Sequence, residues 1–204
     1  MDDIRNLKAL QLDALREVAN IGAGHAATAL SQMTGHRIMI SVPQVQISRL
    51  ENVPNQIAEA EEPVAAVLMK MLGDLTGLTL LVFPQRTALK VASLMMKRPV
   101  GEELGMLERS AIKEAGNILS AAYLNALSEF MGMILLPSPP SMAIDMSDAV
   151  LSSTYLEIAS GSDYVFCVES EFNFTDLGER LRGFFLLMPD VGSLNAILRA
   201  IRVA

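Results

Sequence analysis

Apolar residues recur every three or four positions along the first part of the chain. Between residues 5 and 34 this spacing is combined with good helix formers, and Gly35 follows as a natural helix stop. Residues 36–47 are then rich in β-branched residues around Pro43. The pattern predicts a long amphipathic helix followed by a strand that bends at the proline.

Two apolar runs come next, separated by the turn-forming sequence GDLTG. Residues 64–72 and 77–83 are therefore predicted to be the strands of a hairpin. From Pro84 to residue 97 the apolar spacing is again that of a helix, and proline is well tolerated in a first helical turn. The first half thus predicts the order long helix, strands, short helix.

The same order of patterns returns in the second half of the chain. Residues 103–131 predict a long helix that ends before Gly132, and Pro189 opens a closing helix. The predicted strands between them are 133–144, which prolines interrupt, 163–172 and 181–188.

The two halves also match residue by residue at an offset of 97 positions. The matches include Ala-Leu-Ser at 29–31 and 126–128, glycine at 35 and 132, and proline at 43 and 140. They predict an internal repeat, with repeat 1 at about 5–97 and repeat 2 at about 103–203. Half of the chain is small for burying a sheet face by itself. We therefore expect residues 1–204 to form one α+β domain whose pseudo-symmetric repeats share an antiparallel or mixed sheet.

Two polar triplets occupy the same place in the two long helices. The first is Asp13, Glu17 and Asn20, and the second, 97 residues later, is Ser110, Glu114 and Asn117. At about 100° per residue, each triplet falls on one stripe of its helix and apolar residues fall opposite. Those apolar residues are Leu15, Val18, Gly22, Ala29 and Met33 in the first helix, and Ile112, Ala115, Leu119, Ala126 and Phe130 in the second. The triplets are therefore expected to face solvent.

Small residues stand beside both triplets. They are Gly22, Ala23 and Gly24 in the first helix, and Ser120 and Ala121 in the second. We expect them to permit close approach of a large partner, whereas a small-molecule enzyme needs a concave and mostly apolar pocket. The stripes therefore favour chemistry on the surface of another protein.

The residue types narrow that chemistry. A carboxylate can pair with a lysine of a partner, and an amide can hold a water molecule in line with an electrophile. Side chains that position the reactants without acting as nucleophiles themselves are typical of phosphoryl transfer. Other interpretations stay open: a solvated helix often carries Glu and Asn, and duplication alone preserves likeness. The stripes could also serve only for docking. A metabolic enzyme is poorly supported, because no phosphate-binding glycine loop, metal-ligand cluster or serine nucleophile motif is evident.

Composition restricts the partners and the compartment. A formal net charge of −7 provides no basic stripe for phosphates, so nucleic acid is not expected as a partner. The chain begins with acidic residues and lacks a leader pattern, and residues 64–83 are too interrupted by polar residues and glycines to span a membrane. Cys167 is the single cysteine, which fits a reducing compartment. These features predict a cytoplasmic protein without membrane insertion.

The triplets with their prolines resemble a known signature. DALREVAN with Pro43, and SAIKEAGN with Pro140, are similar to the Asp/Ser-x₃-Glu-x₂-Asn-x₂₂-Pro motif of the CheC/CheX/FliY family of chemotaxis phosphatases. The resemblance covers essentially the whole chain, since the doubled signature and doubled element order both fit the CheC branch. Members of the CheX type carry one signature, and members of the FliY type bring further segments.

The resemblance implies an activity and a division of labour. The substrate would be the phospho-aspartate of a CheY-like response regulator. The implied catalytic residues are Glu17 with Asn20, and Glu114 with Asn117. Each asparagine would orient the attacking water, each glutamate would engage the receiver's lysine, and Asp13 and Ser110 would support the partner surface.

The resemblance also implies partners. The Mg²⁺ would belong to the receiver, so no metal or cofactor is expected in this chain. CheD, a receptor deamidase, is implied as a second partner, and the internal repeat favours a monomer. The non-catalytic alternative is a docking module that binds CheD or a receiver. His25 is expected to be a solvated helix residue and His36 a loop residue, while Pro43 and Pro140 would shape the exit from the first strand of each repeat.

Overall fold

The computed structural model describes residues 9–53, 62–157 and 164–203. Its helices are α1 (Ala9–Thr34), α3 (Gln85–Met96), α4 (Met106–Met131), α5 (Ser147–Glu157) and α6 (Val191–Val203), with a short 3₁₀ turn, η2 (Leu50–Asn52). Its strands are β1 (Ile38–Arg49), β2 (Pro63–Gly73), β3 (Gly77–Pro84), β4 (Leu135–Pro137), β5 (Ser141–Met146), β6 (Tyr164–Phe174) and β7 (Glu179–Pro189). None of the helices in the described ranges combines the length and apolar character needed to cross a membrane.

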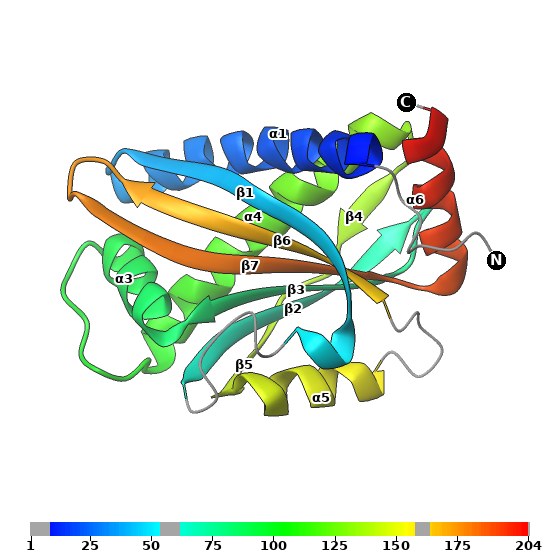
Figure 1. The fold of residues 1–204 in the computed structure, drawn as a ribbon. Helices are drawn as coiled ribbons and strands as arrows, with labels where there is room; N and C mark the ends of the chain where they lie inside the picture. Colours follow the sequence, from blue (N-terminus) through cyan, green and yellow to red (C-terminus); the bar gives the residue numbers. More distant parts are fainter. Residues whose placement is uncertain (1–8, 54–61, 158–163, 204) are drawn as a thin grey trace.

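The strands form one antiparallel sheet in the order β1-β6-β7-β3-β2-β4, with β5 also paired to β2 (Figure 1). The two hairpins, β2-β3 and β6-β7, meet at the centre through β3 and β7. Each hairpin is completed by the first strand or strands of the other half, because β1 pairs with β6 while β4 and β5 pair with β2. The halves therefore share one sheet and exchange strands, as an α+β fold of two pseudo-symmetric repeats requires.

The central strands β2 and β3 are buried on both faces along most of their length. Along β3, Leu81 and Phe83 belong to the larger core, which also contains residues of α1, α3, α4 and α6. Leu80 and Val82 point the other way into a smaller core with residues of α5. Figure 1 shows α1 and α4 lying together across the sheet and α5 on its other side. Burial of both faces explains why these strands are mostly apolar and do not alternate between apolar and polar residues.

The two long helices both end at a glycine in the left-handed conformation, although the closing hydrogen bonds differ. Gly35 and Gly132 adopt positive φ angles of 79° and 64°, which glycine reaches without strain. The N–H of Gly35 donates to the carbonyl of Ser31 at 2.9 Å, and the N–H of Met133 donates to that of Ser128 at 3.1 Å. These left-handed caps explain why the sequence places glycine at both helix ends.

The structure confirms the predicted order of elements in both halves. It corrects the predictions from the sequence at three points. Helix α5 was not predicted, because its serine-rich sequence has no marked apolar face. Pro43 lies inside β1, at a bulge, and does not mark the exit from the strand. Met33, expected on the packed face of the first helix, is 41% exposed. The predicted boundaries of the first helix before residue 9 lie outside the described residues.

Helix α6 begins at a carboxylate cap that ties the two halves together. Ser193 N–H donates to Asp190 Oδ1 at 2.7 Å, and the hydroxyl of Thr76, in the β2-β3 turn, donates to Asp190 Oδ2. These hydrogen bonds hold the pKa of Asp190 below its ordinary value, and the one from the Ser193 backbone N–H contributes most. Because the folded-state pKa is lowered, the stabilisation is present above the unfolded-state pKa and is lost as the pH falls through the folded-state pKa.

We therefore expect Asp190→Ala to lower the free energy of unfolding at pH 7 by about 1 kcal/mol. The difference from wild type should shrink as the pH is lowered from 4 towards 2, which urea unfolding at each pH would measure. Asp190→Asn is the matched control, because it keeps a capping oxygen but cannot titrate. A difference between wild type and Asp190→Ala that is the same at pH 7 and pH 2 would contradict this assignment.

Candidate functional site

The two polar triplets lie on the outer sides of α1 and α4. Asp13, Glu17, Ser110 and Glu114 are exposed, while Asn20 and Asn117 are partly buried. Most of the apolar residues predicted on the opposite sides, among them Leu15, Val18, Ile112 and Leu119, are buried. The predicted orientation of both helices is therefore confirmed, with the difference that the amides sit deeper than the carboxylates.

The small residues beside the first triplet have a different use from the expected one. Gly22 and Ala23 are buried. A Cβ atom at Gly22 would stand 3.0 Å from the Cα of Tyr123 and 2.9 Å from its ring, so this glycine lets α1 and α4 approach each other. On the second helix Ser120 is buried as well, while Gly24 is exposed and has open space around it. Close helix packing, and not access for a partner, accounts for Gly22 and Ala23.

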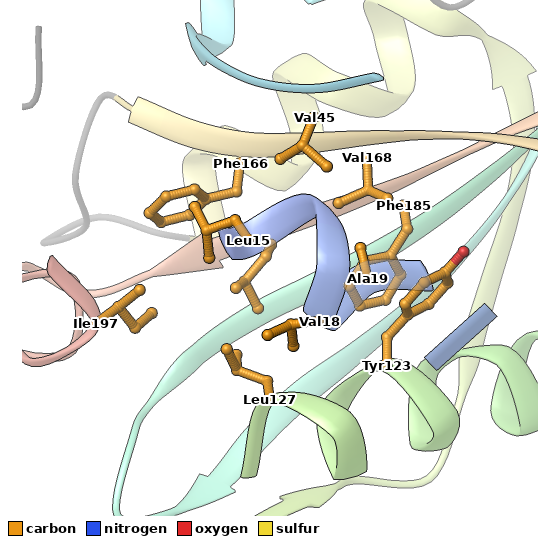
Figure 2. Close-up of a pocket in the computed structure, with 11 residues that line it drawn as sticks. Leu15, Val18, Ala19, Val45, Tyr123, Leu127, Phe166, Val168, Phe185 and Ile197 are labelled. Atoms are coloured by element: carbon orange, nitrogen blue, oxygen red, sulfur yellow. The ribbon is translucent and has the colours of Figure 1, made fainter. Parts of the chain in front are cut away.

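The space behind α1 is apolar and small (Figure 2). Leu15, Val18 and Ala19 of α1 line it together with Tyr123 of α4 and Phe185 of β7, and its volume is about 40 Å³. Ligand pockets are typically about 300–1,000 Å³. This cavity is therefore a packing defect between helices and sheet, with no room for a metabolite.

Two groups that could carry chemistry in other enzymes are inert here. Cys167 is 1% exposed, and burial, aided by the charge of Glu169, raises its pKa to about 12. Tyr123 donates or accepts a hydrogen bond with Ser170 at 2.6 Å, and burial raises its pKa to about 12. Both side chains stay protonated and out of contact with solvent at neutral pH. Neither can serve as a nucleophile or proton carrier on the helix stripes.

The side chain of Asn20 is held by the first strand. The N–H of Val42 donates to Asn20 Oδ1 at 3.1 Å. Because a backbone N–H can only donate, this contact fixes which end of the amide faces β1 and leaves the NH₂ group for the opposite side. Val42 directly precedes Pro43, the proline of the sequence signature. The signature therefore includes the separation along the chain between Asn20 and the strand residue that holds it. Val42 itself was missed, because its contribution comes from the backbone.

The contact depends on a β-bulge. Along β1 and β6, Ile40 pairs with Phe172 and Gln44 with Glu169, so β1 contains one extra residue between these pairs. The register shift lies between Ser41 and Gln44, which leaves Val42 out of the ladder. Proline at position 43 has no N–H to donate and is tolerated at bulges. The bulge thus frees the Val42 N–H for Asn20.

The two histidines lie apart from these contacts. His25 is exposed on α1, as predicted, and no hydrogen bond to its side chain occurs within the described ranges. His36 lies in the turn after α1, where its Nδ1 is 2.7 Å from Asp176 Oδ2. This hydrogen bond lowers the pKa of Asp176. It joins two loops at one end of the sheet.

Comparisons with known proteins agree with the repeat and with the signature. The CheC-like family model matches residues 10–47 and 107–144, two segments separated by the same 97 positions. CheY-P phosphatase CheC of Bacillus subtilis is 31% identical over 205 residues, which cover 98% of both chains. Flagellar motor switch phosphatase FliY of the same organism is 28% identical over 147 residues, 70% of this chain and 38% of FliY.

A solved structure extends the likeness to three dimensions. The crystal structure of Thermotoga maritima FliY superimposes with a TM-score of 0.80 at 25% identity and covers 97% of this chain and 98% of that one. Both family-model segments run from a long helix through the bulged strand region that follows it. The full-length match and the doubled segments lead to one assignment: this chain belongs to the CheC-like family.

Proposed function

We propose that this protein is a chemotaxis phosphatase that hydrolyses the phospho-aspartate of a CheY-like response regulator. The observation that carries the proposal is the full-length similarity to a CheY-P phosphatase, joined to two outward stripes that each present a carboxylate and an amide. A phosphatase is also the activity named for the FliY relative. Convex stripes suit a substrate group carried by another protein, because that protein supplies the rest of the pocket.

The proposed roles follow from what each side chain can do. Asn20 and Asn117 orient the water that attacks phosphorus, since an amide can both donate to and accept from it. Glu17 and Glu114 pair with the receiver's lysine and so align the two proteins. None of these four residues becomes covalently modified, so the acceleration of hydrolysis comes from positioning the water and the two proteins.

The surface around the second stripe favours contact with a protein. Met106 and Leu107, at the start of α4, are 86% and 64% exposed. Met106 lies four residues before Ser110 and eight before Glu114, on the same side of the helix. Exposed apolar residues beside a polar stripe are suited to a protein interface. Asp13 and Ser110 are proposed as supporting contacts of the two stripes.

The remaining partners are proposed from the family. The receiver contributes the Mg²⁺ that neutralises the phosphoryl oxygens, and this chain contributes no metal ligand to the reaction. CheD is proposed as a second partner. The chain is proposed to act as a monomer, because its internal repeat already presents two stripes.

A phosphate-release time course tests the activity. A CheY-like regulator would be phosphorylated in Mg²⁺ and its decay followed with and without this protein. We expect hydrolysis about ten- to a thousand-fold faster than the spontaneous rate, the range that a water-orienting group worth about 1.4 to 4 kcal/mol supplies. Chelating the Mg²⁺ should abolish the acceleration. An unchanged phosphoryl lifetime despite a formed complex would instead support a docking module that regulates without catalysis.

A further inference from the structure

The two copies of the signature are built on the same bulge but differ at one backbone group. In the first copy the bulge lies between the pairs Ile40–Phe172 and Gln44–Glu169. In the second it lies between Pro137–Met71 and Ser141–Leu68, at positions 97 residues later on the bulged strand. The position that corresponds to Val42 is therefore Pro139.

Proline cannot reproduce the contact that Val42 makes. Its nitrogen carries no hydrogen, so Pro139 has nothing to donate to Asn117. Within the described part of the chain, the side chain of Asn117 makes no hydrogen bond, whereas Asn20 is held at 3.1 Å by Val42. Asn117 is partly buried like Asn20, so exposure does not explain the difference.

We propose that the Val42 N–H is a positioning group for Asn20, and that its replacement by Pro139 makes the two sites unequal. The proposal rests on the proposed function and adds a direction to it: the first site is preorganised and turns over faster. An amide anchored at one end holds its other end in one orientation when the partner docks. An unanchored amide must lose rotamer freedom in the transition state.

The expected difference is that of one hydrogen bond. It corresponds to about a two- to tenfold higher turnover number at the first site. The KM for the phosphorylated regulator should be similar at both sites, because the carboxylates Glu17 and Glu114 are exposed in both. A variant that has lost a positioning group should have a lower turnover number and an unchanged KM. A variant with weakened docking should instead have a higher KM.

Single-site proteins allow the comparison. Asn117→Ala leaves only the first site and Asn20→Ala only the second. In the Asn117→Ala background, Val42→Pro should lower turnover by about two- to tenfold, whereas Val42→Ala keeps the N–H and should keep most of the rate. Pro-Pro already occupies the equivalent bulge of the second copy, at Pro139 and Pro140, so the strand tolerates it there.

The reverse change is made at an exposed residue and carries little risk to folding. In the Asn20→Ala background, Pro139→Ala restores an N–H at the second bulge and should raise turnover about two- to tenfold. Pro99→Ala, at another exposed proline, should leave the rate unchanged. Equal turnover in the two single-site proteins, or no response to either Pro139→Ala or Val42→Pro, would overturn the proposal.

Amide hydrogen exchange tests the anchor without any phosphorylated partner. The Val42 N–H should exchange slowly in the wild type and faster in Asn20→Ala, while the N–H of Ile38, which donates to Ser31 Oγ at 3.0 Å on the same strand, should exchange at an unchanged rate. Exchange of Val42 that does not respond to Asn20→Ala would refute the anchor. If the wild type does not accelerate hydrolysis at all, the proposed function fails, and the exchange comparison alone then decides whether the anchor exists.

Discussion

The Asn20→Ala, Asn117→Ala double variant is expected to lose most of the acceleration of phospho-aspartate hydrolysis. Both side chains are partly exposed on helix surfaces, so their truncation leaves the apolar cores unchanged. The loss should be about ten- to a thousand-fold, equal to the contribution of an oriented water. Phosphate release from a phosphorylated CheY-like regulator, measured at saturating and at limiting regulator, would give turnover and KM separately.

Binding must survive for this result to identify the asparagines as catalytic. A titration of the regulator should give the same affinity for the double variant as for the wild type, because Glu17 and Glu114 remain. Asn125→Ala is a matched control, since Asn125 is exposed on α4. An unchanged rate in the double variant would assign the two stripes to docking alone, and loss of rate together with loss of binding would leave the asparagines as contact residues.

The second large effect is expected at the crossing of the two site helices. Gly22→Ala places a methyl group 3.0 Å from the Tyr123 backbone and 3.1 Å from the carbonyl oxygen of Ala122. Backbone atoms cannot turn away as a side chain does, so α1 and α4 must separate. Overpacking of this kind costs about 1–3 kcal/mol. Urea unfolding of the variant should show a free energy of unfolding lower by that amount.

Gly24→Ala is the matched control two residues along the same helix. No atom lies within 4 Å of a Cβ at Gly24. Alanine is favoured over glycine in a helix by about 1 kcal/mol, so this variant should be equally stable or more stable than the wild type. Opposite signs at positions 22 and 24 would establish the steric explanation, whereas stabilisation by both substitutions would show that the helices can be repacked at no cost.

Apolar patterns predict the long helices and the strands β2, β3, β6 and β7 because each of these elements has one dominant apolar pattern. Helix α1 keeps Leu15 and Val18 on the side opposite Glu17, and β2 and β3 are mostly apolar runs on either side of a turn. The apolar pattern does not predict helix α5, because this helix covers one small core with few residues, Val150 and Leu151 among them. Its pattern is too weak to be distinguished from a loop.

The candidate site was predictable as a stripe but not as a set of contacts. A helical wheel gives the direction of Asn20 without telling which group lies beside it. Val42 is 22 residues away, and it acts through an N–H that every residue except proline has. Likewise Gly22 and Gly24 look alike in the sequence, and only the position of Tyr123 distinguishes them. Contacts between elements depend on register and crossing, which local patterns do not contain.

The exchange of first strands between the halves has a consequence for the origin of the chain. A single copy of the repeat would leave its β2-β3 or β6-β7 hairpin without the neighbour that β4 and β5, or β1, now provide. Such a copy would satisfy its open edge by pairing with an identical one around a twofold axis. The present molecule is therefore equivalent to a dimer fused into one polypeptide, and because its two halves are separate stretches of sequence, Val42 in one can be matched by Pro139 in the other.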